Sequence, residues 1–281
     1  MDAAFPFADL ALVLGVLGFL GWRAVTRERR EYGRFRRLRT TAARQRTYRR
    51  WLIEGVAVIG GLAVVTVVGG WPRIGPALAD AQAWPPVAAA REWLGGSFGS
   101  GFAIGAGIAV VAGLIVPVLL IRLDHDDIPT IGDVGALLPR TRGELPYGAG
   151  LALNAGISEE LLFRLGLPAL LFGVTGDGAI AFALAAVVFA LMHVYQGPLG
   201  VLATGVLGLV FSAVYVVSGW IWLPIALHAL VDLRSLVLLP LRVGVLKREE
   251  LARPVLTRTP PAQPVASPAE PPAEPAEPPV D

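Results

Sequence analysis

The chain has 281 residues, of which 54% are hydrophobic and only 16% are charged, and its mean hydropathy is +0.62. Soluble domains carry about 25% charged residues, so this composition excludes an ordinary soluble protein and indicates a membrane protein. The chain contains no cysteine, which excludes disulfides, thiolate nucleophiles and cysteine metal ligands.

A basic segment follows the first apolar run. Residues 5–22 are apolar apart from Asp9 and are long enough to cross a bilayer. The arginines come after this run, whereas a secretory signal would have them first, so we expect a retained span with its N-terminus outside. Twelve arginines lie between Arg23 and Arg50. We expect this segment to be cytoplasmic, partly helical along the bilayer surface and bound to anionic lipid, with no nucleic acid partner.

Two accessory spans follow. Residues 51–71 should run outward and the uncharged residues 101–121 should return inward. The stretch 72–100 between them is rich in Pro, Gly, Ala and Trp, and it predicts an external loop with a short interfacial helix at 87–94. Residues 122–144 mix acids, arginines and turn formers, and we expect His125 and its neighbouring aspartates to be solvated there.

Four more apolar runs complete the bundle, at 145–173, 178–195, 198–217 and 220–241. The first is longer than the roughly 20 residues a straight crossing needs, so it should tilt, or bend near Gly156 or Gly166. The predicted fold is therefore an all-α, polytopic transmembrane helical bundle of about seven spans. Seven crossings from an outside start bring the C-terminus and its positive charges into the cytoplasm. One lysine against 23 arginines favours a bacterial cell membrane.

We divide the chain into four parts. Residues 1–50 hold the first span and the Arg-rich segment, 51–144 two accessory spans, and 145–241 a four-span core. Residues 242–281 begin basic and become rich in Pro, Ala and Glu, which predicts a disordered cytoplasmic tail because this composition cannot bury a core.

The core contains ionisable side chains at helical spacing. Three of its four apolar runs carry them. The first has Glu159, Glu160 and Arg164, the second has His193 with Phe189 one turn before it, and the last has His228 and Asp232. Each charged group would cost about 2.5 to 3.5 kcal/mol at the centre of a membrane helix, so it must face a protein interior or a wet cavity. We therefore expect three helices to converge on one polar site.

The spacing suggests separate roles for the two glutamates. Adjacent helical residues point about 100° apart, so Glu159 and Glu160 cannot both face one cavity. Glu160 precedes Arg164 by four residues, the favourable order for an ion pair. Glu159 is then available as a general base. Asp232 lies one turn after His228 and is expected to orient its ring.

Two chemistries fit this set. In the first, Glu159 deprotonates a water held by His193, while His228 and Asp232 stabilise an oxyanion. In the second, Glu159, His193 and His228 bind zinc with an open position for water. The sequence has no H-E-x-x-H pair, and both options stay open.

The three motifs in this order resemble the CPBP intramembrane proteases, which include type II CAAX prenyl endopeptidases and bacterial Abi or bacteriocin-processing homologues. They read Glu159-Glu160-x-x-x-Arg164, Phe189-x-x-x-His193 and His228-x-x-x-Asp232, and the resemblance covers residues 145–241. It implies a four-helix catalytic core, an endopeptidase activity and zinc as an optional cofactor.

The resemblance also implies residue roles. Glu159 and His193 would activate the attacking water, His228 and Asp232 would support the oxyanion, and Glu160 with Arg164 would be structural or assist. Eukaryotic members often have Asn where this chain has Asp232. An amide can donate a hydrogen bond to an oxyanion and an ionised carboxylate cannot, so Asp232 is expected to orient His228 or to bind a cation.

Two other functions use the same residues. Glu, His and Asp in a membrane cavity also suit the proton relay of a transporter, although no matching pair of interrupted helices is visible in the two halves. A non-catalytic scaffold would recruit partners through the Arg-rich segment and the tail, with Glu160 and Arg164 as an ionic staple. The favoured function is an intramembrane endopeptidase whose substrate is a membrane-associated or C-terminal peptide.

Overall fold

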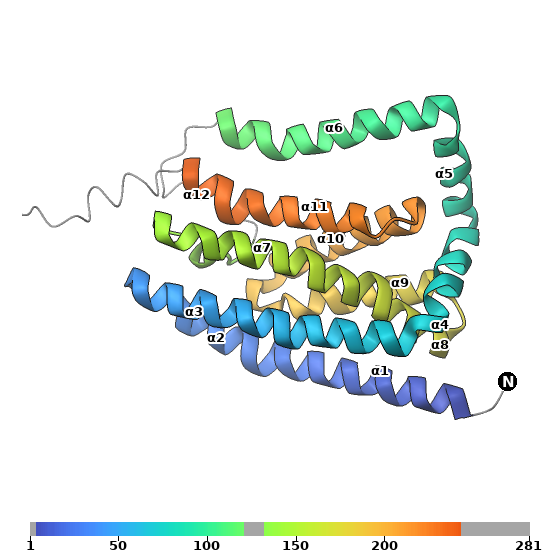
Figure 1. Cartoon of the computed structure of the whole chain (residues 1–281), viewed down its shortest axis with the longest axis horizontal. Helices are drawn as coiled ribbons and strands as arrows, with labels where there is room; N and C mark the ends of the chain where they lie inside the picture. Colours follow the sequence, from blue (N-terminus) through green and yellow to red (C-terminus); the bar gives the residue numbers. More distant parts are fainter. Residues whose placement is uncertain (1–3, 121–131, 243–281) are drawn as a thin grey trace, which may run out of the picture.

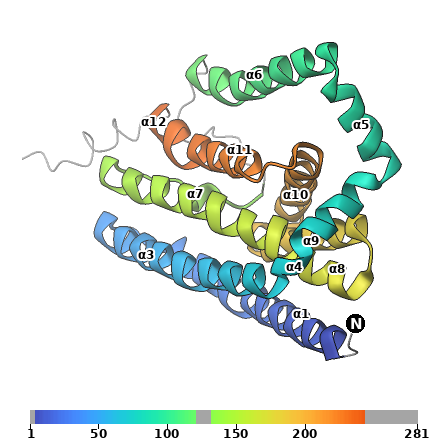
Figure 2. The same ribbon diagram turned by 45° about the vertical axis from the view of Figure 1, so that its right-hand side comes forward.

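The computed structural model describes residues 4–120 and 132–242, and the regular structure in these two ranges is entirely helical. The predicted disordered tail beyond residue 242 and the cluster around His125 lie outside the described residues. The helices form a bundle in which most of the long axes run in a common direction (Figures 1 and 2). The all-α class predicted from the sequence is therefore confirmed.

The bounds of the helices, in chain order, are as follows. The N-terminal part contains α1 Ala4–Trp22, η1 Arg23–Glu28, α2 Arg29–Phe35, α3 Thr41–Glu54, η2 Gly55–Gly60, α4 Gly61–Ala83, α5 Pro85–Gly95 and α6 Ser97–Leu120. The C-terminal part contains η4 Gly135–Leu137, η5 Arg142–Glu144, α7 Leu145–Glu160, η6 Leu161–Gly166, α8 Leu167–Thr175, α9 Gly178–Met192, η7 Val194–Gln196, α10 Gly197–Ser218, α11 Trp222–Leu233, η8 Arg234–Leu238 and α12 Leu239–Arg242. Four of the short segments, η1, η2, η6 and η8, are π-helical.

Within the described ranges, five helical runs are long and apolar enough to cross a membrane: Leu10–Phe35, Thr41–Ala83, Ser97–Leu120, Val194–Ser218 and Trp222–Arg242. Two further predicted spans are present as helices of different character. The fourth is the continuous run of α7, η6 and α8, which carries three charged side chains, and the fifth is α9, an apolar helix of 15 residues. The protein is thus a polytopic membrane protein, and the total of about seven crossings stays a prediction.

The prediction of an external loop at 72–100 is wrong, because most of this stretch is helical. Helix α4 runs to Ala83 with Pro72 and Pro76 inside it. A proline removes one amide donor, and membrane helices tolerate this loss when neighbouring helices pack around the site. Ala77 and Ala81 of α4 are buried against the start of α9. The short helix predicted at 87–94 is present as α5.

The Arg-rich segment is helical, but it forms a hairpin instead of a separate surface helix. The elements η1 and α2 extend α1, and α3 begins the second long run after a turn capped by Thr40. Glu31 of α2 accepts hydrogen bonds of 2.7 Å from both Arg50 and the Trp51 indole of α3. Arg27 pairs with Glu54 at 2.7 Å, so part of the positive charge is used to join the two helices.

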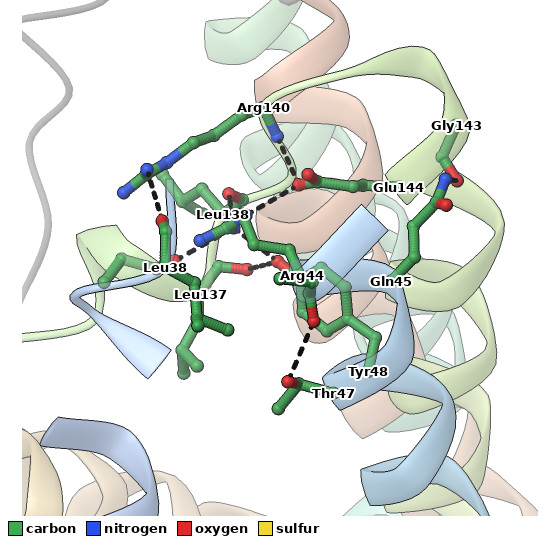
Figure 3. Close-up of polar contacts among 12 residues, drawn as sticks. Leu38, Arg44, Gln45, Thr47, Tyr48, Leu137, Leu138, Arg140, Gly143 and Glu144 are labelled. Atoms are coloured by element: carbon green, nitrogen blue, oxygen red, sulfur yellow. Dashed lines mark hydrogen bonds and ion pairs between the residues drawn. The ribbon is translucent and has the colours of Figure 1, made fainter. Parts of the chain in front are cut away.

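A buried ion pair joins this hairpin to the beginning of α7 (Figure 3). Arg44 Nε lies 3.0 Å from Glu144 Oε2, and the two side chains are 1% and 0% exposed. The guanidinium also donates to the Tyr48 hydroxyl and to the carbonyl of Leu138, while the Arg140 amide donates to Glu144. The contact fixes α3 at the residue that precedes the helix carrying Glu159 and Glu160.

Close helix contacts bring the motif helices together. Helix α7 packs on α11 at Gly156, where an added Cβ would lie 2.9 Å from that of Ala229. Helix α7 is continuous through Gly156, and the π-helical segment η6 that follows it ends at Gly166, the other position at which a bend was expected. Gly156 allows the close approach of α7 and α11 that sets Glu160 beside His228.

Helix α6 has few contacts with the rest of the bundle. Most of its side chains are exposed, and α5 connects it to α4. Arg234 of η8 donates to the carbonyl of Leu114 at 2.9 Å, and Arg242 donates to that of Leu119. These arginines hold the C-terminal half of α6 near the last span.

Candidate active site

One cavity of about 710 Å³ receives side chains from all three motif helices. Glu159, His193, His228 and Asp232 all line it. Phe189 lines it as well, whereas Glu160 and Arg164 are buried behind it, 0% and 1% exposed. The convergence expected from the sequence is therefore present for the four polar side chains that the site would use.

Glu160 forms the charged support of His228. Its Oε1 accepts a hydrogen bond of 2.7 Å from Nδ1 of His228, and its Oε2 lies 3.1 Å from Nε of Arg164. The ion pair between Glu160 and Arg164 was expected from their spacing. The hydrogen bond to His228 was not, because it joins residues 68 positions apart.

Aromatic rings hold the imidazole of His228 in place. Phe211 stacks on it with ring centroids 5.1 Å apart, and Phe189 meets it edge-on at 6.0 Å. The guanidinium of Arg164 lies 4.6 Å from the centroid of Phe189, and Nη2 donates to the carbonyl of Gly208. Arg164 therefore belongs to the structural support of the site.

Asp232 has a weaker connection to His228 than its spacing suggested. Its Oδ2 lies 3.7 Å from Nε2 of the imidazole, beyond hydrogen-bond length. Glu160, rather than Asp232, supplies the hydrogen bond that orients the ring. The Asp232 side chain is 32% exposed and lines the cavity, so its carboxylate is accessible to a bound molecule.

The ring of His193 is fixed by the backbone. Its Nδ1 lies 2.8 Å from the carbonyl of Phe189, one turn earlier. A carbonyl only accepts, so Nδ1 carries the proton and Nε2 of the neutral ring is left with a lone pair. His193 ends α9, with φ −96° and ψ 16°, and the chain continues into η7.

Glu159 differs from its neighbour. It is half-buried, lines the cavity and has no hydrogen-bond partner among the residues of 4–120 and 132–242. Its carboxylate is therefore available to accept a hydrogen bond from water or from a substrate. This is the environment predicted for the carboxylate that Arg164 does not neutralise.

The donors do not form a metal site in this arrangement. Within the two described ranges, no group of three His, Asp or Glu side chains is placed to hold a metal ion. Glu159, His193 and His228 share the cavity, and each histidine uses Nδ1 in a protein hydrogen bond, which leaves its Nε2 as the nitrogen available to a ligand. The zinc set considered from the sequence is not assembled here.

Polar residues outside the three motifs also line the cavity. The Ser158 hydroxyl donates to Asn154 Oδ1 at 3.1 Å, and both side chains lie in the wall. Asn154 and Ser158 are four residues apart in an apolar run, so the sequence could have shown that they share one face of the helix. Tyr195 lines the same space, and its ring centroid lies 6.0 Å from that of His193.

A protein-family model matches the part of the chain that carries the three motifs. Residues 141–234 match the family model of type II CAAX prenyl endopeptidase Rce1-like proteins. This segment is about a third of the chain, and it is similar to the Rce1-like family. The resemblance to CPBP proteases inferred from the motifs is confirmed by this match. No curated protein and no solved structure matched the chain.

The Rce1-like segment contains every motif residue from Glu159 to Asp232. It begins just before Glu144, so the buried ion pair joins the N-terminal hairpin to the start of the matched region. The hairpin itself, which contributes other cavity walls, lies outside the Rce1-like match.

Proposed function

We propose that the protein is an intramembrane endopeptidase that hydrolyses a peptide bond of a membrane-associated or C-terminal peptide. The Rce1-like family supports a CAAX-type intramembrane protease in general. The observation that carries the finer proposal is the common cavity of Glu159, His193, His228 and Asp232. A cavity shared by a carboxylate that has no hydrogen-bond partner in residues 4–120 and 132–242 and by an imidazole with a free Nε2 suits activation of water.

The first step in this proposal is removal of a proton from water. His193 Nε2 accepts a hydrogen bond from the water, and Glu159 takes its other proton. The water oxygen then attacks the carbonyl carbon, and the carbonyl becomes an oxyanion in a tetrahedral intermediate. His228 is held by Glu160 and faces this oxyanion when its Nε2 is protonated.

The second step breaks the C–N bond. The intermediate collapses, the carbonyl reforms, and the proton taken by Glu159 passes to the leaving amine. Asp232 has no donor hydrogen when ionised, so it does not bind the oxyanion directly. Its accessible carboxylate instead balances charge near His228 across 3.7 Å.

The test is cleavage of a peptide library by the purified protein in detergent, with and without a chelator. Glu159→Gln and His193→Ala should each reduce cleavage by about 10²- to 10⁴-fold, the usual contribution of a general base. The control is Glu92→Gln, which changes an exposed glutamate of α5 in the same way. Cleavage that persists with chelator supports water activation without metal.

Two outcomes would contradict the proposal. Undiminished cleavage in Glu159→Gln would remove the assigned base. A proton-dependent solute flux in vesicles that is lost in Glu159→Gln, without any peptide cleavage, would instead support the transporter interpretation.

A further inference from the structure

One wall of the cavity comes from a part of the chain that the family match does not cover. The N-terminal hairpin contributes Arg23, Glu28, Tyr32, Tyr48, Trp51, Gly55 and Ile59 to the lining. Substrate bound at the motif residues would therefore also meet the hairpin. Three of these seven residues are aromatic, and the ring of Tyr32 contacts the ring of Tyr195 in η7, the short helix that follows His193.

Tyr32 reaches from α2 toward His193. Its side chain is only 5% exposed, and its ring centroid lies 5.5 Å from that of Tyr195. The ring of Tyr195 in turn lies 6.0 Å from the imidazole of His193. The three rings form a continuous aromatic wall that begins at the imidazole proposed to hold the water.

Asp133 fixes the outer end of this wall. The Tyr32 hydroxyl donates to Asp133 Oδ1 at 3.2 Å, and Arg36 Nη1 donates to Oδ2 at 2.5 Å. The Asp133 amide donates to the carbonyl of Gln196 at 2.9 Å, in the short helix that follows His193. Asp133 thus connects α2 to the turn that carries Tyr195.

The approach of this loop to Gln196 requires glycine. Gly132 has φ +80°, a left-handed conformation that disfavours a side chain, and an added Cβ would lie 2.9 Å from the Gln196 carbonyl oxygen. The hydroxyl of Tyr32 is therefore directed to Asp133, and its ring is the part available to the cavity.

We propose that Tyr32 determines substrate specificity, in a role that rests on the proposed peptidase function. Its ring bounds the space next to His193 and limits the size of the substrate side chain beside the cleaved bond. An apolar side chain of moderate size would pack against the Tyr32 and Tyr195 rings. A larger aromatic side chain would overlap the position of Tyr32.

The experiment compares cleavage of peptides that differ only in the residues flanking the cleaved bond. Tyr32→Ala should shift the ranking of kcat/KM toward larger side chains by about tenfold, since a pocket discriminates by roughly 10- to 200-fold per methylene-sized change. Tyr32→Phe keeps the ring and should keep the parent ranking. Phe35→Ala removes a buried aromatic residue of the same helix that does not line the cavity, so it should lower thermal stability without changing the ranking.

A second measurement separates this proposal from the peptidase proposal. Fluorescent versions of the same peptides are titrated against Glu159→Gln and against Glu159→Gln with Tyr32→Ala, and the Kd values are ranked by polarisation. A shift of about tenfold toward larger side chains supports the role of Tyr32 even if the parent cleaves none of the peptides. An unchanged ranking in both measurements, or an equal shift in Phe35→Ala, would overturn it.

Discussion

Glu159 and Glu160 are adjacent in sequence and differ in surroundings. Glu160 is 0% exposed, hydrogen-bonded to His228 and paired with Arg164. Glu159 is half-buried at the cavity and has no hydrogen-bond partner in the described part of the chain. A buried charge whose partner is removed destabilises a protein strongly, whereas removal of a charge without a partner does not. The same substitution should therefore have different effects at the two positions.

We predict that Glu160→Gln lowers both stability and cleavage. The amide leaves the Arg164 guanidinium buried without a compensating charge, which should cost about 3 to 5 kcal/mol. Glu159→Gln should lose cleavage and change stability by no more than about 0.5 kcal/mol. Thermal unfolding of the two variants in the same detergent measures the difference, and an equal loss of stability in both would contradict it.

Local spacing predicted the ion pair of Glu160 with Arg164 and missed the hydrogen bond of Glu160 with His228. Residues four apart on a helix share a face, so the ion pair of Glu160 with Arg164 was predictable. The same rule selected Asp232 as the partner of His228, but the hydrogen bond comes from Glu160. A contact between α7 and α11 depends on how the two helices pack, and a single-helix pattern contains no information about that.

At the scale of elements, the N-terminal hairpin and the motif helices are connected by a buried ion pair. Arg44 and Glu144 are almost fully buried, and backbone groups of the segment before α7 complete the contact. The pair lies at the end of α7 that is remote from Glu159 along the helix. It should therefore control the position of the hairpin wall more than the chemistry of the motif residues.

We predict that Glu144→Ala destabilises the protein by about 3 to 5 kcal/mol, because it leaves Arg44 buried without its partner. The control is Arg36→Ala, which breaks an ion pair with Asp133 that is about half exposed and should contribute less than about 1 kcal/mol. Unfolding followed by circular dichroism in detergent measures both. If the Glu144→Ala variant unfolds with the same stability as the control variant, the Arg44–Glu144 pair is dispensable.

At the scale of the whole molecule, the two described ends of the helical bundle lie far apart. The start of α1 and the end of α12 are at opposite ends of the bundle in both views (Figures 1 and 2). This arrangement agrees with an odd number of crossings. The turn between α2 and α3 lies at the same end as α12, and the corner between α5 and α6 lies at the other.

We propose that the arginine-rich end is cytoplasmic, following the charge distribution. The absence of cysteine makes a direct test simple, because single cysteines can be labelled without background. Gly95→Cys at the α5–α6 corner should react with a membrane-impermeant maleimide in intact cells. Arg39→Cys, in the turn after α2, should react only after permeabilisation; the reverse pattern would invert the proposed orientation.

The sequence alone determined the class of the protein, the apolar runs and the candidate residues of the site. Apolar composition excludes a soluble fold, charged groups must leave lipid, and the helical period predicts which of them share a face. At 72–100 composition was the only signal, and the loop that it predicted is wrong. Pro72 and Pro76 lie inside α4, because packing of α4 against its neighbours maintains a helix that proline would otherwise interrupt.

Only the tertiary structure decided which helix supports His228, which elements form the cavity and where the hairpin joins it. The contact of Gly156 with Ala229 brings Glu160 to His228, and the Arg44–Glu144 pair brings Tyr32 and its neighbours to the same space. These are contacts between residues distant in the chain. They depend on the complementary shapes of packed helices, which no periodicity within one helix specifies.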